Sequence, residues 1–236
     1  MWQVRQGAAL RTMQPSGRIP GALPTARSYV DGLRQEGEQV NIAFVGPQGS
    51  GKSTLATMLE ERRLHPYTIL PIAETIRTVA ALGYGEDFDK SKQYTQRRLG
   101  LDVTVSGREV LQEIGAQLRE LDAMFWIKAW HAEYLKIKTS GRLVVVDDVR
   151  LPIEAHYLRA HIPGIVIVRV FASAEARTKR RGVLQGVSDV TEHGYLQTEY
   201  DLQIDTTDLT ADQSYAILRK HMVDNGHWQS SMQEES

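Results

Sequence analysis

The chain has 236 residues, of which 42% are hydrophobic and 24% charged, a composition typical of a soluble globular domain and not of a disordered chain. Its 28 basic and 29 acidic residues leave a net charge of -1, so no overall charge favours a nucleic-acid or membrane partner. The lack of cysteine excludes disulfides and thiolate zinc sites and is consistent with a reducing cytosol, and no apolar run approaches the roughly 20 residues of a membrane span.

The first 38 residues differ from the rest of the chain. They contain five Arg, no Lys and several Gly and Pro, and only 27–35 has a helical pattern. We expect a loosely ordered extension here; a transit peptide is the alternative, but it would carry a sustained amphipathic pattern that this segment lacks. No apolar segment typical of a secretory signal is present.

Short apolar runs then alternate with helical patterns. Strands are predicted at 41–45, 67–70, 142–148, 164–170 and 201–205. Helices are predicted at 52–63, 72–82, 106–120, 122–138, 152–161, 173–182 and 210–223, and those at 106 and 210 begin with a capping box. Consecutive Val and Ile indicate strands buried on both faces. The pattern predicts an α/β fold with three α/β/α layers and a parallel sheet of about five strands.

A glycine-rich loop, GPQGSGKST, joins the first strand to the first helix. It matches G-x-x-x-x-G-K-[ST], in which glycines let backbone N–H groups turn inward around a polyphosphate, and the helix adds its positive N-terminal end. The Lys52 ammonium can reach the β- and γ-phosphates, and the Ser53 hydroxyl can ligate Mg²⁺. The predicted ATP-binding residues in this loop are Gly46, Gly49, Ser50, Gly51, Lys52, Ser53 and Thr54.

Two acids and an arginine end the strand at 142–148. Ligands of parallel sheets gather at the carboxyl ends of strands, so these side chains are expected near the loop. Asp147 and Asp148 point to opposite faces because side chains alternate along a strand, so only one of them faces the site. That carboxylate can hold Mg²⁺ or accept a proton, and Arg150 can clamp a phosphate, although an ordinary ion pair is the simpler alternative. Glu154 is expected to cap the next helix.

The helix at 106–120 has two stripes. The apolar stripe faces a core, whereas the second stripe consists of Arg108, Gln112, Gly115 and Arg119, without an acid. Such a face can hold an anionic ligand. Arg108 and Arg119 lie about 16 Å apart along the axis, so they cannot bind one phosphate, and Arg108 is the better candidate ligand.

Four segments together resemble deoxynucleoside monophosphate kinases of the phage type. They are GPQGSGKST, PIAETIR, SGREVLQEIGAQLRELDAMFWIKAW and RLVVVDDVRLPIEAHYLR, in the family's order over about 41–205. The family pattern matches Arg108, Gln112, Gly115, Arg119, Phe125, Trp126, Asp148, Arg150, Glu154 and Ala155. The chain departs from the pattern at Ser53, Ala116 and Leu151, where many relatives have Asp, Thr and Phe.

The resemblance implies a P-loop kinase of the nucleoside monophosphate kinase type that moves the γ-phosphoryl of ATP, with Mg²⁺, onto a deoxynucleoside monophosphate. The expected catalytic residues are Lys52, Asp148 and Arg150, and the expected metal ligands are Ser53 and Asp148. The expected acceptor-binding residues are Arg77, Arg108, Gln112, Trp126 and Arg150. A lid at about 176–195 would bring Arg177 and Arg181 to ATP, although a solvated basic helix end is the alternative.

These expectations divide the chain into three parts. An N-terminal extension covers 1–38, a kinase domain covers 39–224 with an acceptor region at about 72–138, and a flexible tail covers 225–236. The expected partner is a small nucleotide, with no membrane, and a homodimer is left open. The expected location is the cytoplasm, or that of the host if a phage encodes the chain.

Two other functions stay open. A P-loop kinase acting on a modified base within DNA would keep the chemistry, but the near-neutral charge disfavours a DNA-tracking surface. A motor or switch hydrolysing ATP or GTP would place Glu beside the strand-end Asp, whereas Val149 follows Asp148, and no guanine-reading N-K-x-D is present.

Overall fold

A parallel sheet forms the centre of the molecule in the computed structural model, which describes residues 40–62, 65–182 and 194–229. Its five strands run in the order β2-β5-β1-β6-β7, every neighbouring pair being parallel. They are β1 (Ile42–Val45), β2 (Tyr67–Ile69), β5 (Leu143–Val149), β6 (Val166–Phe171) and β7 (Leu202–Asp205). The predicted α/β class and five-stranded parallel sheet are thus confirmed. The predicted extension at 1–38 lies outside the described residues.

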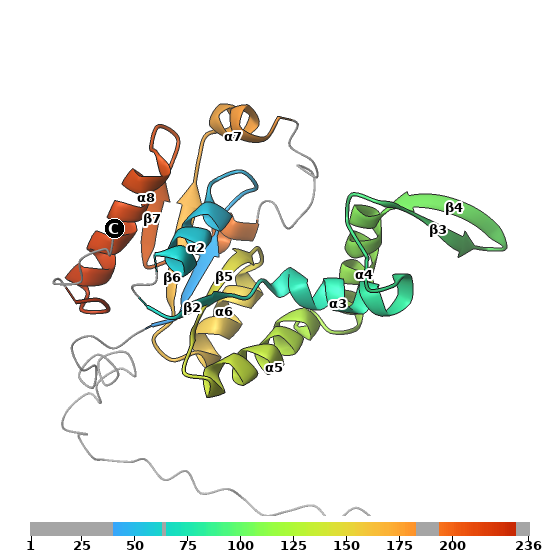
Figure 1. Ribbon diagram of the computed structural model, residues 1–236, viewed down its shortest axis with the longest axis horizontal. Coiled ribbons are helices and arrows are strands. Elements are labelled where there is room, and N and C mark those ends of the chain that lie inside the picture. The colour runs from blue at the N-terminus through green and yellow to red at the C-terminus, as the bar shows by residue number, and fades with distance from the viewer. Residues whose placement is uncertain (1–39, 63–64, 183–193, 230–236) are drawn as a thin grey trace, which may run out of the picture. The chain divides into compact units, whose positions relative to one another are not determined.

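Helices cover both faces of the sheet (Figure 1). On one face lie α2 (Lys52–Glu61) and α8 (Ala211–Asp224), and on the other α5 (Phe125–Thr139) and α6 (Pro152–His161). The remaining helices are α3 (Ile72–Tyr84), α4 (Gly107–Leu121), α7 (Ala174–Arg181) and a 3₁₀ helix, Gly194–Gln197. Within the described residues, no helix is long and apolar enough to cross a membrane.

Alternating side chains of the central strand supply both cores. Ile42 and Phe44 of β1 pack with α2 and α8, whereas Ala43 and Val45 pack with α5 and α6. Each of these side chains is fully buried, because the strand lies between two helical layers. This two-sided burial is the reason that the strand reads as a continuous apolar run in the sequence.

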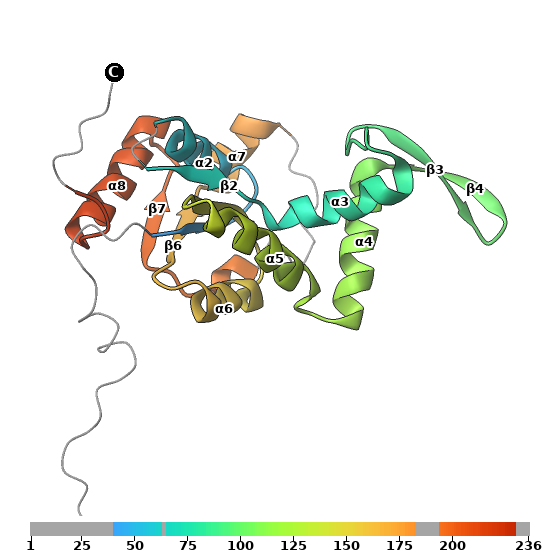
Figure 2. The ribbon, with the colours of Figure 1, turned by 60° about the horizontal axis from the view of Figure 1, so that its bottom comes forward.

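An antiparallel hairpin that the sequence analysis did not predict precedes α4. It consists of β3 (Gln93–Arg98) and β4 (Leu101–Ser106), and among the described residues these strands pair only with each other. Both views show it extending away from the five-stranded sheet, beside α4 (Figure 1 and Figure 2). β3 is polar throughout and the turn lacks Asn or Asp, so the usual hairpin signal is weak. The alternation of Leu101, Val103 and Val105 in β4 is the signal that was present.

The end of the chain is better packed than the sequence analysis predicted. A flexible tail was expected from residue 225, yet Trp228 is buried against the core that contains α8 and β2. The backbone N–H groups of His227 and Trp228 both donate to the carbonyl of Met222, which turns the chain back onto the helix. Residues 230–236 lie outside the described part of the chain.

Candidate active site

The glycine-rich loop connects β1, the central strand, to α2. Gly46, Gly49 and Gly51 all have positive φ angles, of 147°, 80° and 101°, which L side chains rarely adopt. At Gly46 space is also lacking, because a Cβ atom would lie 2.0 Å from the carbonyl oxygen of Val170 on β6. The glycines are therefore required by the backbone path of the loop as well as by any ligand.

Lys52 and Ser53 open α2 at the inner side of this loop. The Lys52 ammonium donates to the carbonyls of Gly46 and Pro47, at 2.7 and 2.8 Å, so the cation sits within the loop. The Ser53 hydroxyl donates to Oδ2 of Asp147 at 2.6 Å. The other carboxylate oxygen of Asp147, Oδ1, is buried and has no hydrogen-bond partner among the described residues. The pair thus joins the helix start to the end of β5 and leaves a carboxylate oxygen available.

The metal-binding role predicted for Asp148 is corrected by this geometry. Asp147 lies two residues after Val145, which packs in the core that contains α2, so strand alternation turns Asp147 toward Ser53 and Asp148 toward the opposite face. Both oxygens of Asp148 accept backbone N–H groups at the start of α3, from Ile72 at 2.7 Å and Ala73 at 2.8 Å. Asp148 is therefore a half-buried carboxylate that caps the start of α3.

Burial raises the pKa of two carboxyls that lie behind the site. It raises the pKa of Asp148, an effect that the N–H groups of α3 partly oppose and the neighbouring Asp147 reinforces. It also raises the pKa of Glu154, whose carboxylate accepts the N–H groups of Arg150 and Leu151 at 2.9 and 3.0 Å. Glu154 thus caps α6, as the sequence analysis expected, and holds the backbone of Arg150.

The Arg150 side chain is exposed, just beyond the end of β5. Its backbone is fixed from two directions: Glu154 binds its N–H group, and Gly194 lies so close that a Cβ there would be 2.4 Å from its carbonyl oxygen. The backbone position of Arg150 is thus well defined. The contact of its side chain with a phosphate stays a prediction.

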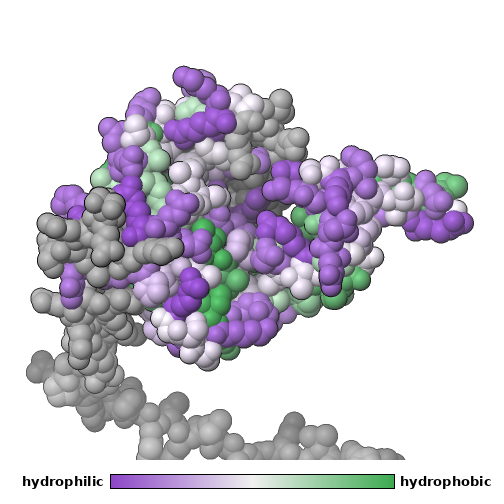
Figure 3. Space-filling view, viewed as in Figure 1, coloured by the Kyte–Doolittle hydropathy of each residue, from purple (hydrophilic) through white to green (hydrophobic). Residues whose placement is uncertain are grey.

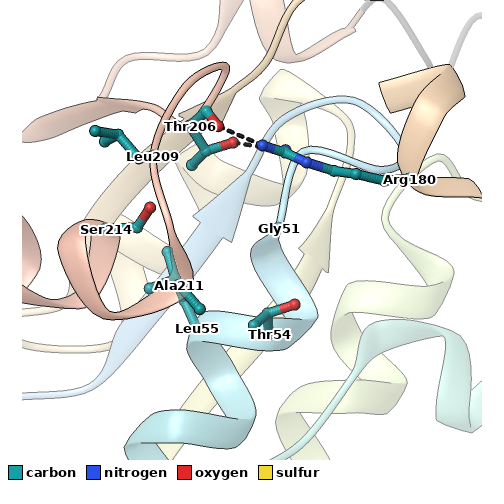
Figure 4. A pocket seen from close by; sticks show the side chains of 8 residues that line it. All are labelled: Gly51, Thr54, Leu55, Arg180, Thr206, Leu209, Ala211 and Ser214. Atoms are coloured by element: carbon teal, nitrogen blue, oxygen red, sulfur yellow. Dashed lines mark hydrogen bonds between the residues drawn. The ribbon is translucent and has the colours of Figure 1, made fainter. Parts of the chain in front are cut away.

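An open pocket of about 130 Å³ lies beside the start of α2 (Figure 4). It is lined by Gly51, Thr54, Leu55, Arg180, Thr206, Leu209, Ala211 and Ser214. Arg180 of α7 donates to the hydroxyl of Thr206 at 3.0 Å and to its carbonyl, and that hydroxyl donates to the carbonyl of Ser50 at 2.8 Å. The sequence analysis missed Arg180 and Thr206, although the position of Thr206, directly after β7, is where ligands of parallel sheets bind.

Arg177 of α7 contacts the glycine-rich loop. Its guanidinium donates to the carbonyl of Gln48 at 3.3 Å, and a Cβ on Gly49 would lie 3.3 Å from its own Cβ. The structure therefore places Arg177 at the loop, and its predicted contact with ATP stays a prediction. The side chain of Arg181 and residues 183–193 of the expected lid lie outside the described part of the chain.

The helix that carries the second stripe, α4, begins as predicted. Ser106 and Glu109 form the capping box, and Gly107 allows close packing, since a Cβ there would lie 2.3 Å from the carbonyl of Asp89. Within the described residues, the half-buried Arg108 side chain forms no hydrogen bond or ion pair, and Gln112 is exposed. Arg108 and Gln112 are therefore accessible to a ligand.

The other end of the stripe has a structural role. Gly115 is buried against α3. A Cβ atom added to Gly115 would lie 3.6 Å from the side chain of Ile76 and 3.5 Å from the guanidinium of Arg119, which folds back over the glycine. The positive charge of Arg119 also opposes the raised pKa of Glu154, so the two groups lie within electrostatic range. Arg108 therefore stays the candidate ligand that the sequence analysis preferred, and its binding to an acceptor stays a prediction.

Trp126, predicted to bind the acceptor, is part of the core. Its side chain is 2% exposed, and its indole N–H donates to the carbonyl of Gly115 at 3.0 Å. It therefore joins α4 to α5 and cannot form a wall against an acceptor base. Arg77, a further predicted acceptor residue, lies on α3 and forms an ion pair with Glu74 one turn earlier.

Replacing Trp126 by phenylalanine tests this structural role. The variant keeps most of the buried apolar surface but leaves the Gly115 carbonyl without its donor, so we expect a loss of about 1–3 kcal/mol in the free energy of unfolding. Chemical denaturation measures the loss. The KM of any accepted substrate should stay within about twofold, because the ring touches no ligand; a large rise in KM with unchanged stability would restore the acceptor role.

Comparisons with known proteins complete this description. No known family profile matches the chain, and no characterised protein matches its sequence. Among solved structures, a sugar kinase from a Janibacter species shares 13% identity, with a TM-score of 0.45 over 78% of this chain and 94% of that one. A shikimate kinase from Acinetobacter baumannii, in complex with shikimate, shares 15% identity, with a TM-score of 0.42 over 80% and 96%.

A gluconokinase from Sinorhizobium meliloti also shares 15% identity, with a TM-score of 0.42 over 81% of this chain and 93% of that one. Identities and TM-scores this low leave the assignment of function to the site itself. Its decisive features are the glycine-rich loop, the Ser53–Asp147 pair and the cationic side chains around them.

Proposed function

We propose that the chain is an ATP-dependent phosphotransferase, and specifically a kinase that transfers the γ-phosphoryl group of ATP to a deoxynucleoside monophosphate. The observation that carries this proposal is the loop at 46–54, where Lys52 lies within the turn and Ser53 binds a strand-end carboxylate with a free, buried oxygen. Such an arrangement is suited to a polyphosphate and its Mg²⁺ ion.

The residues present fit a magnesium ion that binds through few protein ligands. Ser53 and Asp147 would hold it, and Oδ1 of Asp147 supplies a buried oxygen acceptor that the described residues leave unused. Mg²⁺ keeps waters and substrate phosphates among its ligands, so two protein oxygens can be sufficient. When bound, the ion supplies charge neutralisation for phosphoryl transfer.

The donor nucleotide would lie across two neighbouring parts of the site. The loop and Lys52 would hold its phosphates, with Arg177 above them. The pocket between Gly51, Arg180 and Thr206 lies next to the loop and combines apolar walls with an arginine that can stack on a base (Figure 4). This pocket supports a nucleotide as the donor.

The acceptor would lie between the end of β5 and α4. Gln112 of α4 and Arg150 beyond β5 are exposed and Arg108 of α4 is half-buried. Arg77 on α3 forms an ion pair with Glu74. Two separate arginines are suited to a second anion, and phosphoryl transfer relies on bringing two anions in line within a cationic site. Lys52 and the arginines would then balance the charge that spreads over the transferred group.

A coupled ADP-release assay with deoxynucleotides, ribonucleotides and hydroxymethylated analogues tests the proposal. Turnover that depends on a deoxynucleoside monophosphate and on Mg²⁺ is the expected result. Turnover of ATP without any acceptor would instead favour a motor or switch. Activity confined to modified duplex DNA, with steep salt dependence, would favour a DNA-base kinase.

Arg108→Ala tests the acceptor half of the site. Loss of a charge-assisted contact to phosphate is expected to raise the KM for the acceptor about 10- to 100-fold and to leave the KM for ATP unchanged. Steady-state kinetics with each substrate varied in turn give both values. Lys136→Ala, which removes an exposed cation paired with Glu133 on α5, is the matched control and should change neither. An unaltered acceptor KM in Arg108→Ala would remove this residue from the site.

A further inference from the structure

The turn of the β3–β4 hairpin contains a leucine in an unfavourable conformation. Arg98 pairs with Leu101, so Leu99 and Gly100 form a two-residue turn with φ angles of 50° and 84°. Positive φ at both positions defines a type I′ turn, for which Asn-Gly or Asp-Gly is preferred. Leu99 is the only described non-glycine residue with positive φ. A left-handed leucine costs about 1–2 kcal/mol, so the turn alone gives no reason for leucine here.

The same leucine is also fully exposed. Leu99 has 104% of its reference exposure, and Leu101 has 70%. Leu101, Val103 and Val105 share one face of β4, yet only Val105 is buried, against Val110 of α4. The apolar stripe therefore continues beyond the part of the hairpin that α4 covers, and apolar surface is visible at its outer end (Figure 3). Leu99 thus combines an unfavourable backbone conformation with a fully exposed apolar side chain, and together these indicate that another surface covers it.

The charges of the hairpin indicate what that surface is. The tip, 97–102, carries Arg97, Arg98 and Asp102, a net charge of +1. The segment at the base, 85–90, carries three exposed acids and one exposed Lys, a net charge of -2; they are Glu86, Asp87, Asp89 and Lys90. Two hairpins lying antiparallel about a twofold axis would place each basic tip against the acidic base of the other. Three of these charges already have partners: Arg97 pairs with Asp102 at 3.4 Å, Arg98 with Glu113 at 2.6 Å and Asp87 with Lys92 at 2.7 Å. The pairs are exposed and contribute little to stability, so they can be exchanged for contacts with a second chain.

We propose that the β3–β4 hairpin is a dimerisation arm, which packs against the same hairpin of a second copy of this chain, tip to base. The apolar stripe of Leu99, Leu101 and Val103 would be covered in the interface. A two-stranded hairpin is marginally stable by itself, and its outer strand edges have no partner among the described residues, so a second hairpin would stabilise it. The proposal uses no residue of the nucleotide site and does not depend on the reaction.

Leu99→Asn separates this role from the folding of the hairpin. Asn-Gly is the preferred type I′ sequence, so the variant should keep or improve the local turn while it removes the apolar contact. We expect the full-length wild-type chain to dimerise between about 1 and 100 µM, and Leu99→Asn to weaken dimerisation at least about tenfold. Sedimentation velocity over a dilution series gives the dissociation constants, and thermal unfolding confirms that the variant is folded.

Matched variants sharpen the result. Leu135→Asn removes another exposed leucine, on α5, and should leave dimerisation unchanged. Leu101→Thr keeps a β-forming residue and should weaken the dimer as Leu99→Asn does. Arg97→Glu should weaken it too, and Asp87→Lys added to the same chain should restore it, because tip and base charges are exchanged together. A wild-type chain that stays monomeric, or a dimer that Leu99→Asn and Leu101→Thr leave intact, would overturn the proposal.

Discussion

Asp147→Asn is expected to lower kcat/KM by about 100-fold or more, with little change in stability. In the wild-type protein the Ser53 hydroxyl donates to Oδ2 of Asp147 at 2.6 Å. The amide oxygen of Asn can still accept this hydrogen bond, so Ser53 at the start of α2 keeps its partner. What disappears is the negative charge and the buried oxygen Oδ1, which the described residues leave without a partner. The Mg²⁺ concentration needed for half-maximal activity should rise, and a magnesium titration measures it.

Asp148→Asn is the matched comparison, because the two carboxyls are adjacent and differ in what they bind. Asp148 accepts the N–H groups of Ile72 and Ala73 with both oxygens, and an amide can replace only one of these acceptors. Its main effect should be a loss of about 1–3 kcal/mol in the free energy of unfolding, with an unchanged magnesium requirement. If Asp148→Asn changed the magnesium requirement and Asp147→Asn did not, the metal-binding role predicted for Asp148 from the sequence would be right.

Lys52→Ala is expected to lower kcat by about 10²–10³-fold, the effect of removing a preorganised charge from a phosphate site. In the structure the ammonium lies against the carbonyls of Gly46 and Pro47, so it is already positioned within the loop. Binding should weaken as well. Nucleotide at 100 times its Kd stabilises a folded protein by about 2.7 kcal/mol, and Lys52→Ala should lose most of that stabilisation in a thermal-shift assay.

Lys220→Ala provides the control for this measurement. Lys220 lies on α8 and forms an exposed ion pair with Asp224, so its loss removes the same charge from the chain without touching the loop. Its thermal shift with ATP should equal that of the wild-type protein. An equal shift in Lys52→Ala would show that the loop holds no phosphate through this lysine, and the proposed donor site would then be wrong.

Local sequence signals were strong enough to predict most elements of the fold. The glycine-rich loop needs three positive φ angles, which only glycine adopts readily, and the capping boxes at Ser106 and Thr210 need particular side chains three residues apart. Buried strands require apolar side chains on both faces, so β1, β5 and β6 are evident as apolar runs. These features depend on neighbours in the sequence and can be predicted from it.

The choice between Asp147 and Asp148 depended on the tertiary structure. The alternation of a strand guarantees that the two side chains point to opposite faces, but only the packing of Val145 against α2 decides which of them meets Ser53. Trp126 is a similar case. The family resemblance implied an acceptor-binding role for Trp126, whereas the packing of α4 on α5 buries its side chain, with the indole N–H donating to the carbonyl of Gly115.

The sequence by itself therefore determined the α/β class, the order along the chain of the five strands of the central sheet, and the glycine-rich loop, because each depends on local patterns or on conformations that few residues adopt. The tertiary structure decided which carboxylate meets Ser53, that Arg180 and Thr206 line a pocket with Gly51, and that residues 93–106 form a hairpin. These features join residues far apart in the chain, or depend on which face of a strand or helix is covered, and the local pattern of residues is the same for either outcome.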